Sequence, residues 1–149
     1  EGAELVPGDV TPTPYDDHSA AHLAGWKRCQ GPTPGYDEQC FFYWSPTAKG
    51  DQTRCLFRNA AGDRAVSLSF VASELPCVTF WKHLLGRGDG YVVGIEPGTN
   101  FPNCRSVERQ AGRLKHLAPG ETYRTTLEIA CHLTADEVAA AIDAVEQGT

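Results

Sequence analysis

Residues 91–121, YVVGIEPGTNFPNCRSVERQAGRLKHLAPGE, are the stretch that indicates the fold most directly. They open with the apolar run 91–95, whose β-branched and aromatic residues fit a buried strand. Glu96, Pro97 and Gly98 follow this run. Because proline has no backbone N–H and glycine tolerates a positive φ, we expect the strand to end there. The pattern predicts that Glu96 is a carboxylate at the exit of an apolar strand.

The position predicted for Glu96 suits a general base. A charged group beside apolar residues costs free energy unless it is paired or lies solvated at a cleft. A carboxylate at a cleft can take a proton from a bound hydroxyl group. The alternative is an ordinary strand-end carboxylate in a surface ion pair, since structural networks contain such groups too. The residues alone leave both interpretations open.

The composition is typical of a single globular domain. The chain has 149 residues, of which 41% are hydrophobic and 21% charged, and its net charge is −6. With a pI near 5.3 it offers no basic patch, so we expect neither nucleic acid nor an anionic membrane as partner. No apolar run approaches the roughly 20 residues of a membrane span, and the first ten residues lack a signal-peptide pattern. These features predict a soluble, cytoplasmic protein.

The cysteine spacing is too wide for a C-x-x-C zinc or redox motif. We interpret the six cysteines as reduced thiols, and a secreted disulfide scaffold is the alternative that their even number leaves open. Asp17, His18 and His22 are conceivable metal ligands because the histidines stand four residues apart, but we favour a solvated helix or loop face. We expect no metal and no cofactor. The cysteines are Cys29, Cys40, Cys55, Cys77, Cys104 and Cys131.

Aromatic and β-branched runs recur about every ten residues between turn signals, which is typical of an antiparallel sandwich or barrel-like fold. Near the end of the chain, Thr134 and Glu137 form a capping box that starts a helix over about 135–146. We therefore predict one mainly β domain, an antiparallel β-sandwich with one C-terminal α-helix. Its expected parts are a loop-rich segment at 1–37, a β-sheet region at 38–133 with strands near 38–44, 54–59, 65–72, 77–81, 91–96 and 123–133, and the helical segment 134–147.

Three motifs stand in the order found in a known superfamily. GIEP at 94–97 leads through a loop containing Asn103 to LAPGETY at 117–123, and GYDEQCF lies upstream at 35–41. They resemble a strand ending in glutamate, a Leu-Pro-Gly-Glu turn and a glycine-aromatic-aspartate motif. The chain thus resembles the galactose mutarotase-like (aldose 1-epimerase) superfamily over nearly its whole length.

Three further pairs of residues place the resemblance within that superfamily. They are an EQ strand start at 38–39, an LP pair at 75–76 and a WK pair at 81–82. Together with the GIEP strand end, they make the chain most similar to the DUF4432 branch of aldose-epimerase-like proteins.

This resemblance implies a β-supersandwich with a cleft for a monosaccharide or sugar derivative. It implies that Glu96 is the general base that takes the proton from the anomeric hydroxyl, while an aromatic ring such as Trp81 or Tyr91 offers a flat wall to the sugar. The alternatives are core packing for Trp81 and a solvated surface position for Lys82. The implied substrate-binding residues are Asp37, Glu38, Lys82, Trp81 and His83.

The chain also departs from the family. The segment His-x-Asn-(Phe/Leu)-Gly, which carries the family's general-acid histidine, is absent, and so is the upstream Asn-Arg substrate pair. The chain contains no methionine. We expect a C-terminal half that needs an N-terminal half or forms a homo-oligomer, and a processed mature protein is the alternative. Three functions remain: an aldose 1-epimerase-type isomerase, a non-catalytic sugar-binding module, and a structural half that binds a partner chain.

Overall fold

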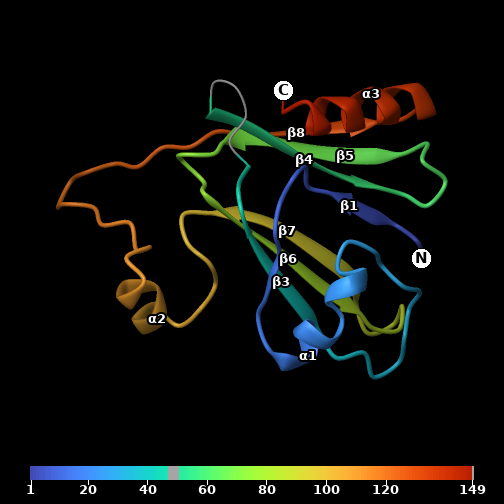
Figure 1. Ribbon diagram of the computed structural model, residues 1–149, viewed down its shortest axis with the longest axis horizontal. Helices are drawn as coiled ribbons and strands as arrows, with labels where there is room; N and C mark the ends of the chain where they lie inside the picture. Colours follow the sequence, from blue (N-terminus) through green and yellow to red (C-terminus); the bar gives the residue numbers. More distant parts are fainter. Residues whose placement is uncertain (47–50, 149) are drawn as a thin grey trace.

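The computed structural model describes residues 1–46 and 51–148, which form a sandwich of two four-stranded antiparallel sheets (Figure 1). The first sheet has the order β1-β4-β5-β8 and the second the order β2-β3-β6-β7. This architecture confirms the predicted fold class. The strands are β1 (Glu4–Val6), β2 (Thr13–Pro14), β3 (Gln39–Trp44), β4 (Gln52–Arg58), β5 (Ala65–Val71), β6 (Cys77–Leu84), β7 (Tyr91–Gly98) and β8 (Leu127–His132); the helices are α1 (Asp17–Ala21), the 3-10 turn η1 (Leu23–Gly25), α2 (Arg105–Gln110) and α3 (Ala135–Glu146).

The main core fills the space between the two sheets. Alternate residues of a strand point to opposite faces, so Phe41 and Tyr43 of β3 point inward together with Val78 and Phe80 of β6. The indole of Trp26 closes the core against these rings, with its centroid 6.0 Å from that of Phe41. The residues between them on β3 and β6 therefore point away from the core, onto the outer face of the second sheet.

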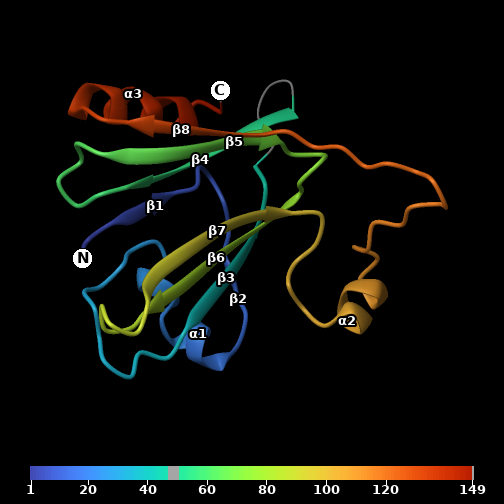
Figure 2. The ribbon, with the colours of Figure 1, turned by 180° about the vertical axis from the view of Figure 1, so that it is seen from behind.

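Helix α3 lies on the outside of the first sheet (Figures 1 and 2). It begins where predicted, because the Thr134 hydroxyl accepts a hydrogen bond from the backbone N–H of Glu137 at 3.2 Å. Its buried stripe packs on Leu56 and Ala65 of the sheet beneath it. The predicted C-terminal helix is thus confirmed. The stripe consists of Val138, Ala141 and Val145.

Strand β7 continues beyond its predicted end. Pro97 pairs with Val78 and Gly98 pairs with Cys77, so the prediction that the strand ends at Glu96 is wrong by two residues. The proline is tolerated because β7 is an edge strand and loses no inner ladder bond there. Glu96 is consequently a residue within the strand, held in register opposite Thr79.

Other segments also differ from the sequence prediction: β6 extends to Leu84 instead of ending at Trp81, and helix α2 lies within the predicted β-sheet region. The loop-rich first 37 residues contain β1, β2, α1 and η1. The last strand begins at Leu127 rather than at Tyr123, because the preceding residues cross from α2 toward the first sheet (Figure 1). On this crossing the hydroxyl of Tyr123 donates to the backbone carbonyl of Glu74 at 2.5 Å. A side-chain hydrogen bond therefore fixes Tyr123, where the sequence predicted the ladder hydrogen bonds of a strand.

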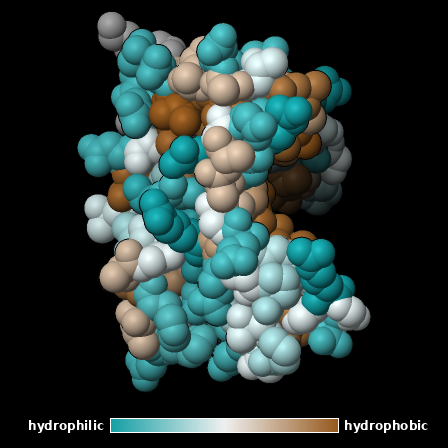
Figure 3. Space-filling view, turned by 90° about the vertical axis from the view of Figure 1, so that its right-hand side faces the viewer, coloured by the Kyte–Doolittle hydropathy of each residue, from teal (hydrophilic) through white to brown (hydrophobic). Residues whose placement is uncertain are grey.

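The inner face of the first sheet is uncovered at its β8 edge. Cys131 lies opposite Val66 and Ile129 lies opposite Leu68, so these side chains share the face that carries the core. Ile129 is 64% exposed. Figure 3 shows hydrophobic side chains at the surface in a recess along one side of the molecule, at the right of the view. We call Val66, Leu127, Ile129 and Cys131 the β8 face.

All six cysteines lie in the described part of the chain, and none of them is paired in a disulfide there. Cys29, Cys55 and Cys77 are buried. Within residues 1–46 and 51–148, no helix combines the length and the hydropathy that crossing a membrane would require.

Candidate functional site

The second sheet displays most of the predicted site residues on its outer face. Three pairs of the β6–β7 ladder carry the site on this face, and they alternate with pairs that point toward the core. Because Trp81 is the neighbour of inward-pointing Phe80, its ring points outward. Cys40 of β3 lies beside Trp81 on the other side. The three ladder pairs are Thr79–Glu96, Trp81–Gly94 and His83–Val92.

Glu38, Trp81 and His83 form one contact cluster. The indole Nε1 of Trp81 donates a hydrogen bond to Oε2 of Glu38 at 2.9 Å. The Trp81 ring stacks on the His83 ring, with centroids 5.3 Å apart and an angle of 15° between the planes. The same Glu38 oxygen lies 4.0 Å from Nδ1 of His83, a buried nitrogen that has no hydrogen-bond partner among the described residues. The cluster fixes the indole plane and leaves Glu38 exposed to solvent.

Glu96 pairs with Thr79, two residues along β6 from Trp81, and its side chain folds back along β7. A β-carbon built on Gly94 would lie 2.5 Å from Oε1 of Glu96. The carboxylate therefore occupies the space beside Trp81 that the missing side chain of Gly94 leaves free. Glu96 is exposed, so the carboxylate is accessible to a ligand on this face.

The thiol of Cys40 lies beneath these carboxylates. Burial raises the pKa of Cys40 to about 12, and the negative charges of Glu96, Glu38 and Asp16 add to that rise. A thiol with such a pKa stays protonated at neutral pH and is a poor nucleophile. Cys40 thus lines the site without being a chemical participant. Its electrostatic neighbours also show that Glu38 and Glu96 act on the same small region of the sheet.

Asp37 points toward helix α1. Its Oδ2 lies 4.0 Å from Nδ1 of His18, and the side chain is 77% exposed. The rings of His18 and His22 lie 4.7 Å apart, and Nδ1 of His22 lies 2.9 Å from the backbone carbonyl oxygen of His18. Within the described residues, these groups form no cluster of three or more His, Cys, Asp or Glu side chains that could hold a metal ion.

Lys82 does not lie with the other predicted site residues. It is 3% exposed and points toward the core face of β6, opposite in direction to Trp81 and His83. Its Nζ donates to the backbone carbonyl of Arg28 at 3.2 Å. Tyr91, the other aromatic ring considered as a wall for the sugar, also packs against the core. The structure thus brings together Glu38, Trp81, His83 and Glu96, with Asp37 at the margin.

The far end of the same outer face is covered by the segment after β7. The Phe101 ring stacks on Phe42, with centroids 4.9 Å apart and an interplanar angle of 18°. The guanidinium carbon of Arg113 lies over the Phe101 ring, 5.4 Å from its centroid. Glu108, which is fully buried, binds Arg113 through two hydrogen bonds of 2.6 and 2.7 Å and accepts a third from Asn103 at 2.8 Å.

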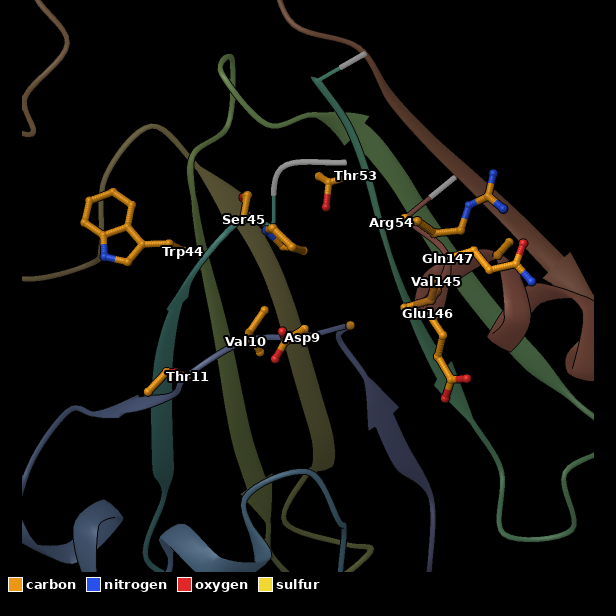
Figure 4. Close-up of a pocket in the computed structure, with 14 residues that line it drawn as sticks. Asp9, Val10, Thr11, Trp44, Ser45, Thr53, Arg54, Val145, Glu146 and Gln147 are labelled. Carbon is orange, nitrogen blue, oxygen red and sulfur yellow. The ribbon is translucent and has the colours of Figure 1, made fainter. Parts of the chain in front are cut away.

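A separate cavity of about 680 Å³ lies between the chain before β2, the end of β3 and the C-terminal turn of α3 (Figure 4). None of the predicted site residues lines it. Its polar lining groups come from Asp9, Thr11, Thr53, Arg54 and Glu146 among others. It is therefore distinct from the outer-face cluster.

The sequence analysis missed several residues that shape the outer face. Gly94 carried a usable signal, because a glycine inside an apolar strand often marks a close approach of another group. No sequence signal indicated the ion pair of Glu108 with Arg113. The arginine lies beyond the end of α2, and the irregular chain brings it back to the carboxylate. Cys40 was interpreted only as a thiol in an apolar run.

The fold is that of the aldose 1-epimerase-like β-sandwiches, as a comparison with solved structures shows. The chain superimposes with a TM-score of 0.94 on a crystal structure from Klebsiella pneumoniae subsp. pneumoniae MGH 78578, described as a "putative aldose 1-epimerase". The two are 33% identical, and the match covers 99% of this chain and 39% of that chain.

The family follows from the sequence itself. Residues 1–131 match the family described as Domain of unknown function (DUF4432), and the chain belongs to this family. The resemblance stated from the motifs is thereby confirmed. Among curated proteins no match is found.

Proposed function

We propose that the outer face of the second sheet is a carbohydrate-binding site of the aldose 1-epimerase type, with Glu96 as the general base. One observation carries this proposal. Glu96 lies on the same open sheet face as the Glu38–Trp81–His83 cluster, opposite Thr79 and two residues along β6 from Trp81. Kinship to a structure described as a "putative aldose 1-epimerase" supports the reaction class. The substrate would be a monosaccharide or a sugar derivative.

Each side chain has a role that its chemistry permits. The indole of Trp81 offers a flat apolar surface for a sugar ring, and the stack on His83 keeps it rigid. Glu38 uses Oε2 to hold the indole, which leaves Oε1 free to accept hydrogen bonds from sugar hydroxyls. Asp37, which is highly exposed, adds a second acceptor at the edge of the site.

The chemistry begins with proton transfer to Glu96 from the anomeric hydroxyl of the sugar. The bond between C1 and the ring oxygen then breaks, the ring oxygen takes a proton, and the open-chain aldehyde rotates before the ring closes on the other face. The acid that protonates the ring oxygen is not assigned to this chain, whose histidines do not stand in the family's general-acid motif.

The variant Glu96→Gln tests the assignment of the base. Anomer interconversion is followed by polarimetry with a panel of hexoses and pentoses, and sugar binding is followed separately by NMR. We expect Glu96→Gln to lose turnover and to keep its fold and most of its sugar affinity, because an amide accepts hydrogen bonds but does not take the proton. Glu128→Gln, an exposed carboxylate on β8, is the matched control. An unchanged rate in Glu96→Gln would show that Glu96 is not the base.

A second candidate is a sugar-binding module without turnover. The absence of the general-acid histidine motif favours it. It predicts that the chain binds a sugar, that Asp37→Ala or Glu38→Ala weakens this binding, and that no amount of protein accelerates anomer interconversion. Turnover by the wild-type chain excludes this candidate.

A third candidate is association with another chain through the β8 face. Uncovered apolar surface on a sheet edge favours association, and the exposed side chains of Leu127 and Ile129 supply it. Sedimentation velocity of the wild-type chain and of Ile129→Lys tests this. We expect oligomers of the wild type that the added charge disrupts, and a monomeric wild type at micromolar concentration would exclude self-association.

A cytoplasmic location is part of the proposal. Six free thiols suit a reducing compartment, because oxidising compartments favour disulfides. Subcellular fractionation of the host cell tests this, and recovery in a secreted fraction would contradict it.

A further inference from the structure

Lys82 is a buried cation without an acidic partner. It is 3% exposed, and its Nζ lies 5.3 Å from the centroid of the Phe41 ring. Its hydrogen-bond acceptor is the carbonyl oxygen of Arg28 at 3.2 Å. No carboxylate of the described residues forms an ion pair with it. Burying an ammonium group in this way is unfavourable.

Lys82 is among the residues that line a pocket of about 540 Å³, together with residues from the end of α1 and from η1. Gln39, which lies directly opposite Lys82 in the β3–β6 ladder, lines the same pocket and is 3% exposed. Its Oε1 is buried and has no hydrogen-bond partner among the described residues. The pocket is therefore lined by a lysine and by its cross-strand neighbour, whose side-chain acceptor is unused among the described residues. Its other titratable lining groups are Glu1, His22, Arg28 and Cys29.

Burial favours the neutral form of the amine. It lowers the pKa of Lys82, and the nearby thiol of Cys29 opposes this only in part. The neutral form of a lysine is the nucleophile toward carbonyl carbon, and a desolvated lysine reaches that form more readily than an exposed one. The two features that an imine-forming lysine needs, a desolvated amine and an adjoining space for the carbonyl compound, occur together at Lys82.

We propose that Lys82 is a carbonyl-reactive amine that forms a Schiff base with small aldehydes entering this pocket. The neutral Nζ attacks the carbonyl carbon and yields a carbinolamine, whose new hydroxyl group can donate to the free Oε1 of Gln39. Loss of this hydroxyl as water, with the second amine proton, gives the imine. The step is a condensation and requires no oxidant or reductant.

This site is independent of the proposed carbohydrate site. Trp81 and His83 flank Lys82 in the sequence, but they point to the outer face of the sheet, whereas Lys82 points to the core face. The two proposals can therefore be tested independently of each other. A labelling experiment at Lys82 requires no sugar turnover.

The test is competitive labelling of the folded wild-type chain with glycolaldehyde and cyanoborohydride, which reduces the imine to a stable amine. Peptide mapping by mass spectrometry then compares Lys82 with Lys27 and Lys115. Both controls also hold their Nζ over an aromatic ring, of Trp26 and Tyr123 respectively, but neither is buried. We expect Lys82 to be labelled faster than either control, and the preference to vanish when the chain is unfolded in urea.

A variant at Gln39 adds a second measurement. Gln39→Leu keeps the size of the side chain and removes the acceptor, so the rate at Lys82 should fall while those at Lys27 and Lys115 stay the same. Equal or slower labelling of Lys82 in the folded wild type would overturn the proposal. So would a preference that persists in the unfolded chain, because it would then reflect local sequence and not the pocket.

Discussion

The carboxylate of Glu96 lies where the side chain of Gly94 would otherwise be. A β-carbon on Gly94 would come within 2.5 Å of Oε1. Since Gly94 is the ladder partner of Trp81, its lack of a side chain allows Glu96 to reach toward the indole. The glycine thus sets the distance between the proposed base and the proposed sugar wall.

Gly94→Ala should displace the Glu96 carboxylate without unfolding the chain. The new methyl group meets the flexible end of a side chain rather than backbone, and Gly94 does not have a left-handed φ. We expect a melting temperature close to that of the wild type and a clear loss of sugar binding or turnover. Gly88→Ala is the matched control, because a β-carbon there meets nothing within 4 Å. Full activity in Gly94→Ala would show that the position of Glu96 is unimportant.

Trp81→Phe should keep an aromatic ring at this position and remove its hydrogen bond to Glu38. The phenyl ring can still stack on His83, but Glu38 loses the Nε1 donor that holds it. We expect a stability loss of about 1 kcal/mol, since that is the net value of one hydrogen bond, and weaker sugar binding. Urea unfolding and sugar titrations measure the two effects. Unaltered sugar affinity would argue against Trp81 as the wall of the site.

Glu108→Gln should destabilise the segment that covers the Phe42 end of the sheet. The fully buried carboxylate holds Arg113 and Asn103, and removing its charge leaves the guanidinium without its partner. Breaking a buried pair from one side costs about 3 kcal/mol. Urea unfolding measures the loss, with exposed Glu121→Gln as the control. Equal stability of the two variants would mean that Glu108 contributes nothing through this pair.

We expect Glu108 also to make the stability of the folded chain depend on pH. Hydrogen bonds from Arg113 lower the pKa of Glu108 from its ordinary value of 4.5 to about 2 in the folded chain. A lowered pKa means that the folded state favours the charged form, so the contribution is complete above pH 4.5 and is lost as the pH falls toward 2. The difference in unfolding free energy between wild type and Glu108→Gln should shrink over this interval. A constant difference would contradict it.

The sequence predicted the fold class, the C-terminal helix and most strands, because these depend on local periodicity and caps. It placed Lys82 and Trp81 in one cleft, although adjacent residues of a strand point to opposite faces. It also ended β7 at Glu96, since a proline in an edge strand cannot be told from one that stops a strand. The buried pair of Glu108 and Arg113 depends on how an irregular segment folds back, which no short-range pattern encodes.

The most direct test of the proposed carbohydrate site is an amide and indole NMR correlation spectrum of this chain, recorded with and without a panel of hexoses and pentoses. The Trp81 indole signal is identified by its absence in Trp81→Phe. We predict that one sugar shifts this signal together with the amide signals of Glu38, Gly94 and Glu96. The indole signals of Trp26 and Trp44 should stay in place. A well-dispersed spectrum in which no sugar moves the Trp81 and Gly94 signals would contradict it.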